Sequence, residues 1–342
     1  MQNPVRTASL KKVDILSVEE IQLWDSLSRS ERHIASPFLS AHFARAVGAS
    51  GVDARACLIQ DNDRISAFFP FMYESRWACR FGAAQRIGGE MTDSFGIVAS
   101  SGFQTSSKEL LRLAKIHYLS FSHLDGAQFR YGLVGEQPRV GLRALLDPQA
   151  TPVLSSMQPR YIKDSARRLR KLVEEVGPIN FQFDVVHDRS AQLDHLITQK
   201  RKQYKASKAS DSMKDSWKRD TLNILLNYKF DTCQGVLSTL YAGNHWIASH
   251  FGLMGNGILH FWFPVYNPEF SRYAPGRLLF HNIIDACIEH KFDTIDRGEG
   301  DTSTKREITN EEYSLYRGVW QSGSVTGSLV HTANRVKWRL GL

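Results

Sequence analysis

The sequence predicts an α/β fold in two domains, and three observations carry this prediction. Residues 258–305 contain a short aromatic and β-branched strand, a Pro-Gly turn, a helix and a second short strand. This order is typical of a βαβ crossover, which joins two parallel strands. The chain has 342 residues, which is long for a single hydrophobic core. Residues 149–159 lack periodicity, so we predict domains of residues 1–152 and 153–342.

The first half begins with two predicted helices and a hairpin. Ser17 and Glu20 form a capping box at the start of the first helix, and Ser40 is the expected cap of the second. A turn at residues 61–63 joins the two strands of the hairpin. The expected strands are 55–59, 65–73 and 128–134, and a third helix is expected over 107–121.

The second half begins with a helix whose outer faces are basic and whose predicted core face is Ala166, Leu169 and Val173. Its hairpin repeats the pattern of the first-half hairpin, which favours two similar domains. The expected helices are 162–176, 189–205, 216–230, 276–290 and 310–319. The expected strands are 181–186, 235–241, 246–254, a strand beginning at 258, 292–295 and 325–330.

Composition indicates an ordinary globular protein, with 42% hydrophobic and 23% charged residues. Its four cysteines lack metal-binding spacing, which favours reduced thiols, a cytoplasmic location and no bound metal. No apolar run approaches the ~20 residues that span a bilayer. The net charge is +8, and residues 158–219 hold fifteen Lys or Arg against eight Asp or Glu. This basic segment favours an anionic partner, such as a CoA phosphate, an acidic sugar, a nucleotide-linked sugar or RNA.

The turn before the predicted helix 276–290 is a plausible phosphate site, because a helix N-terminus and two arginines, Arg272 and Arg277, meet there. The segment resembles the acyl-CoA-binding core of GNAT-type N-acyltransferases. It is most similar to their CelD-like branch, which is related to Fem-type peptidoglycan transferases. The motifs that carry the resemblance are Tyr266-Asn-Pro-Glu269, Pro275-Gly276-Arg-Leu-Leu279 and Asp296…Gly300…Lys305. In the last motif Glu299 stands where that branch has an arginine.

The resemblance implies two GNAT-like domains, mixed twisted sheets with flanking helices, of which the second binds acyl-CoA. The first, over residues 1–152, is then a degenerate copy that shapes the acceptor site. The implied co-substrate is acyl-CoA, and acetyl is the acyl group that this family most often transfers. No metal is expected. The implied cofactor-binding residues are Arg272, Tyr273, Pro275, Gly276, Arg277 and Leu278.

Acyl transfer from a thioester requires a base for the attacking group and a donor for the departing sulfur. The candidate catalytic residues are Asp296, Glu299, His250 and Tyr266, of which Tyr266 is the expected donor to sulfur. Two further candidates for the base are His260 and Asp93. Asp93 and Lys305 are the expected contacts of the acceptor. Each also has an ordinary structural explanation: an ion pair for Asp296, a buried core position for His250 and His260, and solvated positions for the others.

The predicted reaction transfers an acyl group to an amine or hydroxyl of an amino sugar, a nucleotide-sugar or a polysaccharide precursor, which would be the small-molecule or saccharide partner. One alternative is a Fem-like transferase that takes an aminoacyl group from tRNA; apart from that case, no nucleic acid is expected. The other alternative is a non-catalytic GNAT-like partner protein. The sequence carries no indication of oligomeric state.

Overall fold

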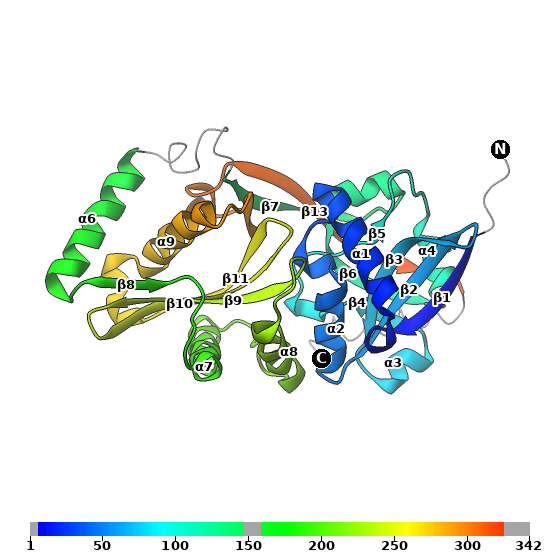
Figure 1. The fold of residues 1–342 in the computed structure, drawn as a ribbon, viewed down its shortest axis with the longest axis horizontal. Helices are drawn as coiled ribbons and strands as arrows, with labels where there is room; N and C mark the ends of the chain where they lie inside the picture. The colour runs from blue at the N-terminus through cyan, green and yellow to red at the C-terminus, as the bar shows by residue number, and fades with distance from the viewer. Residues whose placement is uncertain (1–5, 147–158, 325–342) are drawn as a thin grey trace. The chain divides into compact units, whose positions relative to one another are not determined.

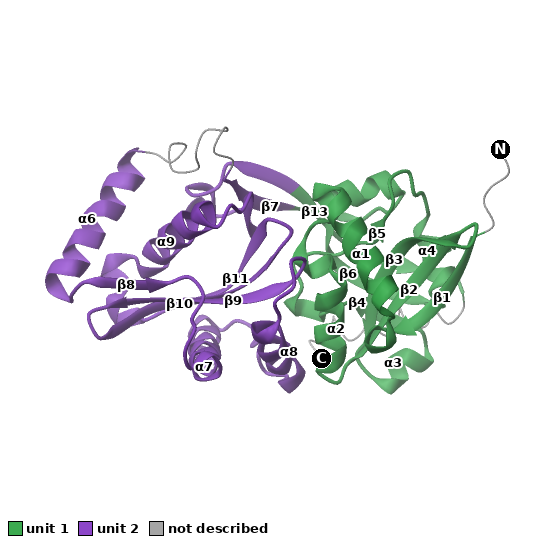
Figure 2. Ribbon diagram, in the orientation of Figure 1, with its two compact units in different colours: residues 1–139, 314–342 green, residues 140–313 purple. Residues whose placement is uncertain are grey.

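The computed structural model describes residues 6–146 and 159–324, which fall into two compact units (Figures 1 and 2). Unit 1 combines residues 1–139 with 314–342, and unit 2 consists of residues 140–313.

The chain passes between the units inside two strands, β7 (Gln137–Leu145) and β13 (Glu311–Gln321). The units therefore divide the chain at other places than the predicted domains 1–152 and 153–342. The last part of β13 belongs to unit 1 because it pairs with β6 of that unit. Residues 147–158, which hold most of the predicted boundary, lie outside the described residues.

Unit 1 is a mixed sheet with the strand order β1-β2-β3-β4-β6-β13, and β5 pairs with β3. The neighbours are antiparallel apart from β4 and β6, which are parallel. The strands are β1 (Arg6–Lys12), β2 (Asp53–Asp61), β3 (Arg64–Tyr73), β4 (Ala83–Arg86), β5 (Val98–Ala99) and β6 (Tyr118–Asp125). The helices are α1 (Val18–Ser30), α2 (Ala41–Ala49), α3 (Arg76–Arg80) and α4 (Ser107–Leu113).

Unit 2 has the strand order β7-β12-β11-β10-β9-β8, and only β11 and β12 are parallel. Helix α9 covers one face of these strands, and α7 and α8 lie on the other (Figure 1). The strands are β8 (Ile179–Gln182), β9 (Gln234–Ala242), β10 (His245–Gly255), β11 (Ile258–Tyr266) and β12 (Thr294–Glu299). The helices are α6 (Pro159–Glu175), α7 (Arg189–Ser207), α8 (Ser216–Asn227), α9 (Pro275–Glu289) and α10 (Ser303–Arg306).

The two units share one strand plan, as the two similar hairpins in the sequence predicted. In each, an edge strand (β1 or β8) pairs with a hairpin, β2–β3 or β9–β10. An antiparallel strand follows, and then a parallel one: β4 and β6 in unit 1, and β11 and β12 in unit 2. The βαβ crossover predicted over residues 258–295 is confirmed as β11–α9–β12.

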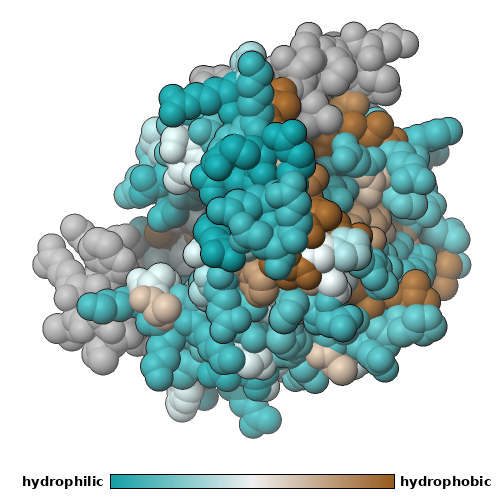
Figure 3. Space-filling model, turned by 90° about the vertical axis from the view of Figure 1, so that its left-hand side faces the viewer, coloured by the Kyte–Doolittle hydropathy of each residue, from teal (hydrophilic) through white to brown (hydrophobic). Residues whose placement is uncertain are grey.

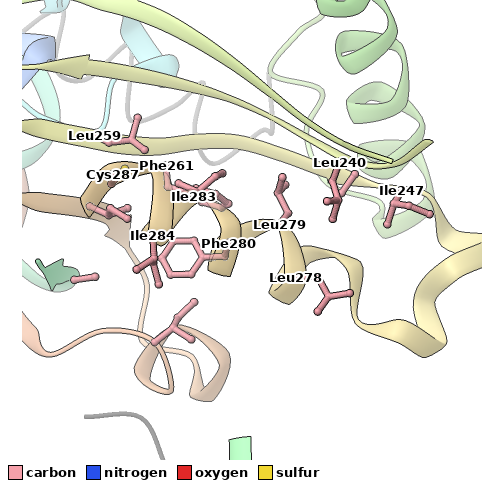
Figure 4. Packing of buried hydrophobic residues seen from close by; sticks show 14 of the residues in the cluster. Leu240, Ile247, Leu259, Phe261, Leu278, Leu279, Phe280, Ile283, Ile284 and Cys287 are labelled. Atoms are coloured by element: carbon pink, nitrogen blue, oxygen red, sulfur yellow. The ribbon is translucent and has the colours of Figure 1, made fainter. Parts of the chain in front are cut away.

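The core of unit 2 lies between α9 and strands β9 to β12 (Figure 4). Leu279, Ile283 and Cys287 recur at helical spacing, and each is fully buried. Phe280 and Ile284 lie beside them and pack in the same cluster. This apolar face fixes α9, and therefore its N-terminus, against the sheet.

Three predicted elements differ from the structure, and a fourth lies outside the described residues. The helix expected over 107–121 ends at Leu113, and the chain then enters strand β6, because the helical pattern of that segment runs into a strand. Residues 128–134 begin in a 3-10 helix rather than a strand. Residues 311–319 belong to strand β13 rather than to a helix; its aromatic residues Tyr313, Tyr316 and Trp320 are three and four residues apart, a spacing that is also typical of a helical face. The final strand expected over 325–330 lies outside the described residues.

Helix α6 is rotated relative to its predicted core face. Its buried residues are Tyr161, Ser165 and Leu172, whereas Leu169 and Val173 are exposed. The side of unit 2 that carries α6 is mostly hydrophilic, with smaller hydrophobic areas beside the helix (Figure 3). Among the described helices, none is both long enough and apolar enough to cross a membrane.

We predict that Ile283→Ala lowers the free energy of unfolding by about 2–5 kcal/mol, because it opens a cavity in the core beneath α9. Urea unfolding followed by circular dichroism measures this change. Glu289→Ala, on an exposed position of the same helix, is the control and should stay within about 0.5 kcal/mol of the wild type. Equal effects of the two substitutions would contradict the packing described here.

Candidate active site

Strands β11 and β12 run side by side for three residue pairs and then separate. The pairs are Ile258–Thr294, Leu259–Ile295 and His260–Asp296. Beyond them β11 continues along β10, whereas β12 shifts register and pairs with β7 through Glu299 and Gly141. We call residues 260–262 of β11 and 296–298 of β12 the divergence point. It lies at the carboxyl ends of two parallel strands, where open α/β sheets bind their ligands.

A β-bulge lies in β11 at the divergence point. Opposite Gly252 of β10, the register shifts so that Phe261 and Trp262 face a single residue. The Trp262 N–H donates a hydrogen bond of 3.3 Å to Nε2 of His250. A side chain therefore takes the place of a strand partner for this backbone donor.

The Asp296 carboxylate is buried and held by several donors. It accepts hydrogen bonds from the Gly298 N–H at 2.7 Å, the Tyr313 hydroxyl at 2.9 Å and Arg143 Nε at 3.1 Å. Burial alone raises the pKa of Asp296, but the nearby charges of Arg143 and His260, with the hydrogen bonds, bring that pKa below its ordinary value. Asp296 is therefore an ionised carboxylate, and its surroundings make it a weak base.

His260 lies beside Asp296 and is also buried. Its Nδ1 is 3.8 Å from Oδ1 of Asp296. A buried carboxylate beside an imidazole is the usual arrangement of a general base and its partner, and at 3.8 Å the two side chains attract each other without a hydrogen bond. This pair is therefore better suited to proton transfer than Asp296 alone.

His250 is fully buried and stacks on the ring of Phe261, with 4.2 Å between the ring centroids. Burial lowers its pKa well below the ordinary value, and the charges of His260, Arg297 and Lys200 act in the same direction. His250 is therefore neutral at neutral pH and is a poor proton acceptor.

The other predicted catalytic and acceptor residues of unit 2 lie at the ends of the two diverging strands. Tyr266 ends β11 and is 43% exposed. Glu299 ends β12 and is partly buried. Lys305 Nζ donates to the carbonyl oxygens of Arg297 at 2.8 Å and Glu299 at 2.6 Å. Lys305 therefore stabilises the end of β12 by satisfying two of its backbone carbonyl groups.

The predicted phosphate site is the N-terminus of α9. Ala274 precedes the helix in the left-handed conformation, and Pro275 occupies the first helical position. The N–H groups of Arg277 and Leu278 donate to the carbonyl oxygen of Ala274. Among the described residues the Gly276 N–H has no backbone acceptor, and a Cβ placed on Gly276 would meet no atom within 4 Å. The Cβ side of Gly276 therefore faces open space.

Both arginines of this turn form ion pairs with acidic residues of α6. Arg272 Nη2 is 2.9 Å from Glu175 Oε2, and Arg277 Nη1 is 3.0 Å from Asp164 Oδ2. These side chains are partly exposed, from 23% for Arg277 to 64% for Arg272. The remaining predicted cofactor residues of the turn, Tyr273 and Leu278, are buried in the core.

Asp93 lies in unit 1, within a polar cluster at the end of the parallel pair β4–β6. Its Oδ1 is 3.6 Å from Nε2 of His123, whose Nδ1 is 2.9 Å from Ser122 Oγ. Buried Arg86 contacts both Ser122 and His123. His123 has a φ of 60°, which is a strained backbone conformation for a residue other than glycine. Such strained conformations are found most often at functional sites.

Three residues around the divergence point were not predicted from the sequence as site residues: Arg143, Tyr313 and Arg297. Arg143 lies on strand β7, which was not predicted, and Tyr313 lies on β13, which was predicted as a helix. Arg297 was considered only as an ion-pair partner of Asp296. In the described residues, no group of three or more His, Cys, Asp or Glu side chains is arranged to hold a metal ion.

Residues 160–306 match the family described as "Acetyltransferase (GNAT) domain". Among solved structures, FemX is similar, with 10% identity and a TM-score of 0.59 over 91% of this chain and 97% of that one. A tandem GNAT protein from the clavulanic acid biosynthesis pathway has 8% identity and a TM-score of 0.52, over 93% and 99%. L-PGS from Bacillus licheniformis has 14% identity and a TM-score of 0.50, over 85% and 90%. No curated protein matches the chain.

These comparisons confirm the predicted fold class, two GNAT-like domains of mixed α/β structure, and within them residues 160–306 are similar to the GNAT acetyltransferase domain. The narrower resemblance to the CelD-like branch stays a prediction. At identities of 8–14% the solved structures share the fold, and the roles of individual residues are left to the geometry.

We predict that Asp296→Asn destabilises the protein by roughly 1–3 kcal/mol at pH 7, because it weakens the charge-assisted hydrogen bonds that the carboxylate accepts from Arg143, Tyr313 and the Gly298 N–H. The pKa of Asp296 is lowered in the folded state, so its contribution is present at neutral pH and is lost as pH falls through that pKa, below the ordinary value of 3.8. Urea unfolding of wild type and variant from pH 7 to pH 3 should show the difference shrinking toward acid. Asp220→Asn, at an exposed position, is the control; a pH-independent difference for Asp296→Asn would contradict the assignment.

Proposed function

We propose that the protein is an acyl-CoA-dependent acyltransferase, most simply an acetyltransferase, that acts on an amine or hydroxyl. The observation that carries this proposal is the divergence of β11 and β12, the strands that precede and follow α9, whose N-terminal turn leaves open space beside Gly276. A thioester placed at the divergence point and a diphosphate placed at the helix N-terminus would then belong to one extended ligand. The match of residues 160–306 to the GNAT domain supports the same arrangement.

The diphosphate of CoA would contact the Gly276 N–H, Arg272 and Arg277. The existing ion pairs of these arginines do not prevent this, because partly exposed ion pairs contribute only about 0–1 kcal/mol each. A phosphate brings more negative charge than a single carboxylate and also gains the helix N-terminus. Exchange of Glu175 and Asp164 for the ligand is therefore favourable.

His260 is the proposed general base, and Asp296 is its positioning partner. His260 would take a proton from the acceptor amine or hydroxyl as that group attacks the thioester carbon. The C–S bond then breaks, and the departing thiolate would take a proton from solvent. Tyr266, the donor predicted from the sequence, lies six residues beyond His260 on β11, roughly 20 Å at about 3.3 Å per residue, which is too far to protonate the same sulfur. Glu299, at the end of β12, is the second candidate for the base. His250 is too strongly shifted toward its neutral form to serve.

The proposed acceptor is an amino sugar, a nucleotide-sugar or a polysaccharide precursor. The excess of basic residues over 158–219 supports an acceptor that carries negative charge. On α6, however, Arg167 and Arg168 both pair with Asp164, and Lys171 lies 3.5 Å from Glu175. The excess charge of α6 is thus partly neutralised within the helix. Asp93 and Lys305 remain the proposed acceptor contacts.

Two alternatives keep the same fold. A Fem-like transferase would take an aminoacyl group from tRNA, and the similarity of the fold to FemX supports this alternative. A non-catalytic GNAT-like partner protein would bind CoA without turning it over. Thermal shifts with CoA and with tRNA, combined with a thiol-release assay, separate the three.

We predict that Gly276→Glu abolishes CoA binding and leaves the fold intact, because the new carboxylate occupies the phosphate position while its Cβ meets no neighbour. In the wild type, CoA at 100 times its dissociation constant should stabilise the protein by ~2.7 kcal/mol, which a thermal shift detects. Gly276→Ala is the matched control and should retain the shift. If Gly276→Glu bound CoA normally, the phosphate site would lie elsewhere.

We predict that His260→Gln lowers kcat about a hundredfold or more, because general base catalysis typically contributes that much, and leaves CoA affinity within about twofold. Thiol release under saturating acyl-CoA gives kcat, and calorimetry gives the affinity. His187→Gln, at an exposed position, controls for the loss of an imidazole. Unchanged turnover in His260→Gln would remove His260 as the base.

A further inference from the structure

Arg297 follows Asp296 on β12, and its guanidinium lies against two aromatic rings of the core. Its Cζ is 4.7 Å from the ring centroid of Phe261 and 4.3 Å from that of Phe280. Successive residues of a strand point to opposite faces. Arg297 therefore points toward α9, whereas Asp296 points toward Arg143 and Tyr313.

The guanidinium of Arg297 lacks a counter-charge within the described part of the chain. Its Nε and Nη1 atoms are buried, and neither has a hydrogen-bond partner there. Burial lowers the pKa of Arg297 to about 10, which shows how strongly its surroundings disfavour the charge. Contacts with aromatic faces offset part of that cost but leave the N–H groups unmet.

A second unmet donor lies on the same aromatic ring. His250 stacks on Phe261 and uses Nε2 to accept from the Trp262 N–H, so the proton of its neutral ring is on Nδ1. Nδ1 of His250 is buried and has no partner among the described residues. Phe261 lies on β11, between β10 with His250 and β12 with Arg297, so the two unmet donors lie on opposite faces of its ring.

We propose that Arg297 forms a receptor for a carboxylate group carried by one of the two substrates. A carboxylate is planar, accepts several hydrogen bonds and neutralises a guanidinium. The inference deepens the proposed function, because it places this group next to the thioester.

A CoA phosphate does not suit the receptor as well. Phe280, which contacts Arg297, is five residues beyond Pro275, about 7.5 Å along the helix axis at 1.5 Å per residue. The diphosphate belongs at the start of the helix, where Gly276 and two arginines lie. The acyl end of the ligand, or the acceptor that attacks it, is closer to Arg297.

The test is a comparison of matched ligands that differ in one carboxylate. Succinyl-CoA against butyryl-CoA tests a carboxylate on the acyl group. Glycine against glycinamide, with CoA saturating, tests a carboxylate on the acceptor. Calorimetry on the full chain should show a preference of about tenfold or more for the carboxylate in one arm, since hydrogen bonds to charged groups are the strong kind.

Arg297→Met should abolish that preference, because methionine fills the space between the two rings without donors or charge. Arg297→Lys should restore part of it, since the charge returns without the planar fork. Arg201→Met removes an exposed arginine of α7 and should match the wild type. If Arg297→Met does not fold, the wild type and Arg297→Lys still give the comparison. A merely structural role of Arg297 would leave the preference unchanged or absent in every variant.

The outcomes separate the inference from the proposed function. CoA binding without any Arg297-dependent carboxylate preference overturns the inference alone. A glycine preference that depends on Arg297, in a protein that fails to bind CoA, overturns the proposed function alone. Inorganic phosphate that binds Arg297 as tightly as either carboxylate would show that the class of ligand is wrong.

Discussion

The constraint on which the site depends is that backbone donors and acceptors must find partners where two paired strands separate. A buried N–H or C=O without a partner costs as much as a lost hydrogen bond. Around the divergence point side chains supply what the missing strand would have supplied. His250 accepts from the Trp262 N–H, Asp296 accepts from the Gly298 N–H, and Lys305 donates to the carbonyls of Arg297 and Glu299. The polar residues that mark this region in the sequence are therefore structural as well as chemical.

Because these side chains also satisfy backbone groups, the catalytic roles expected from the sequence have to be reassigned. Asp296 is a conspicuous carboxylate in the sequence, yet its oxygens already accept from Gly298, Tyr313 and Arg143. A carboxylate in that state orients its neighbour better than it accepts a proton, which moves the proposed base to His260. Leu278, a predicted cofactor residue, also has a structural role. It lies on the buried face of α9 and packs in the core that holds the helix against the sheet. Its contribution to a cofactor site is therefore indirect.

The sequence predicted those parts of the fold whose periodicity is strong and local. The spacing of Leu279, Ile283 and Cys287 predicted α9, and the Asn62 turn predicted the hairpin of unit 1. The sequence could not predict that β7 pairs with β12 and that β13 pairs with β6. The partners in each pair are far apart in the sequence, so their pairing leaves no local pattern. Arg143 and Tyr313 were missed for the same reason, since both come from these two strands. The ion pairs of Arg272 and Arg277 with α6 depend on how that helix is rotated, and its apolar pattern predicted the wrong face.

The two neighbouring residues Asp296 and Arg297 show why burial alone does not identify a functional charge. Asp296 is buried, Arg297 is partly buried with its Nε and Nη1 atoms out of contact with solvent, and both carry charge at neutral pH. The strand alternation sends Asp296 toward an arginine and a tyrosine, where its charge is balanced, and sends Arg297 toward two phenylalanines, where it is not. A balanced buried charge specifies geometry, whereas an unbalanced one lowers the stability of the empty protein. Such a cost is recovered only when a ligand supplies the missing charge, and Arg297 therefore points to a ligand more directly than the carboxylate beside it.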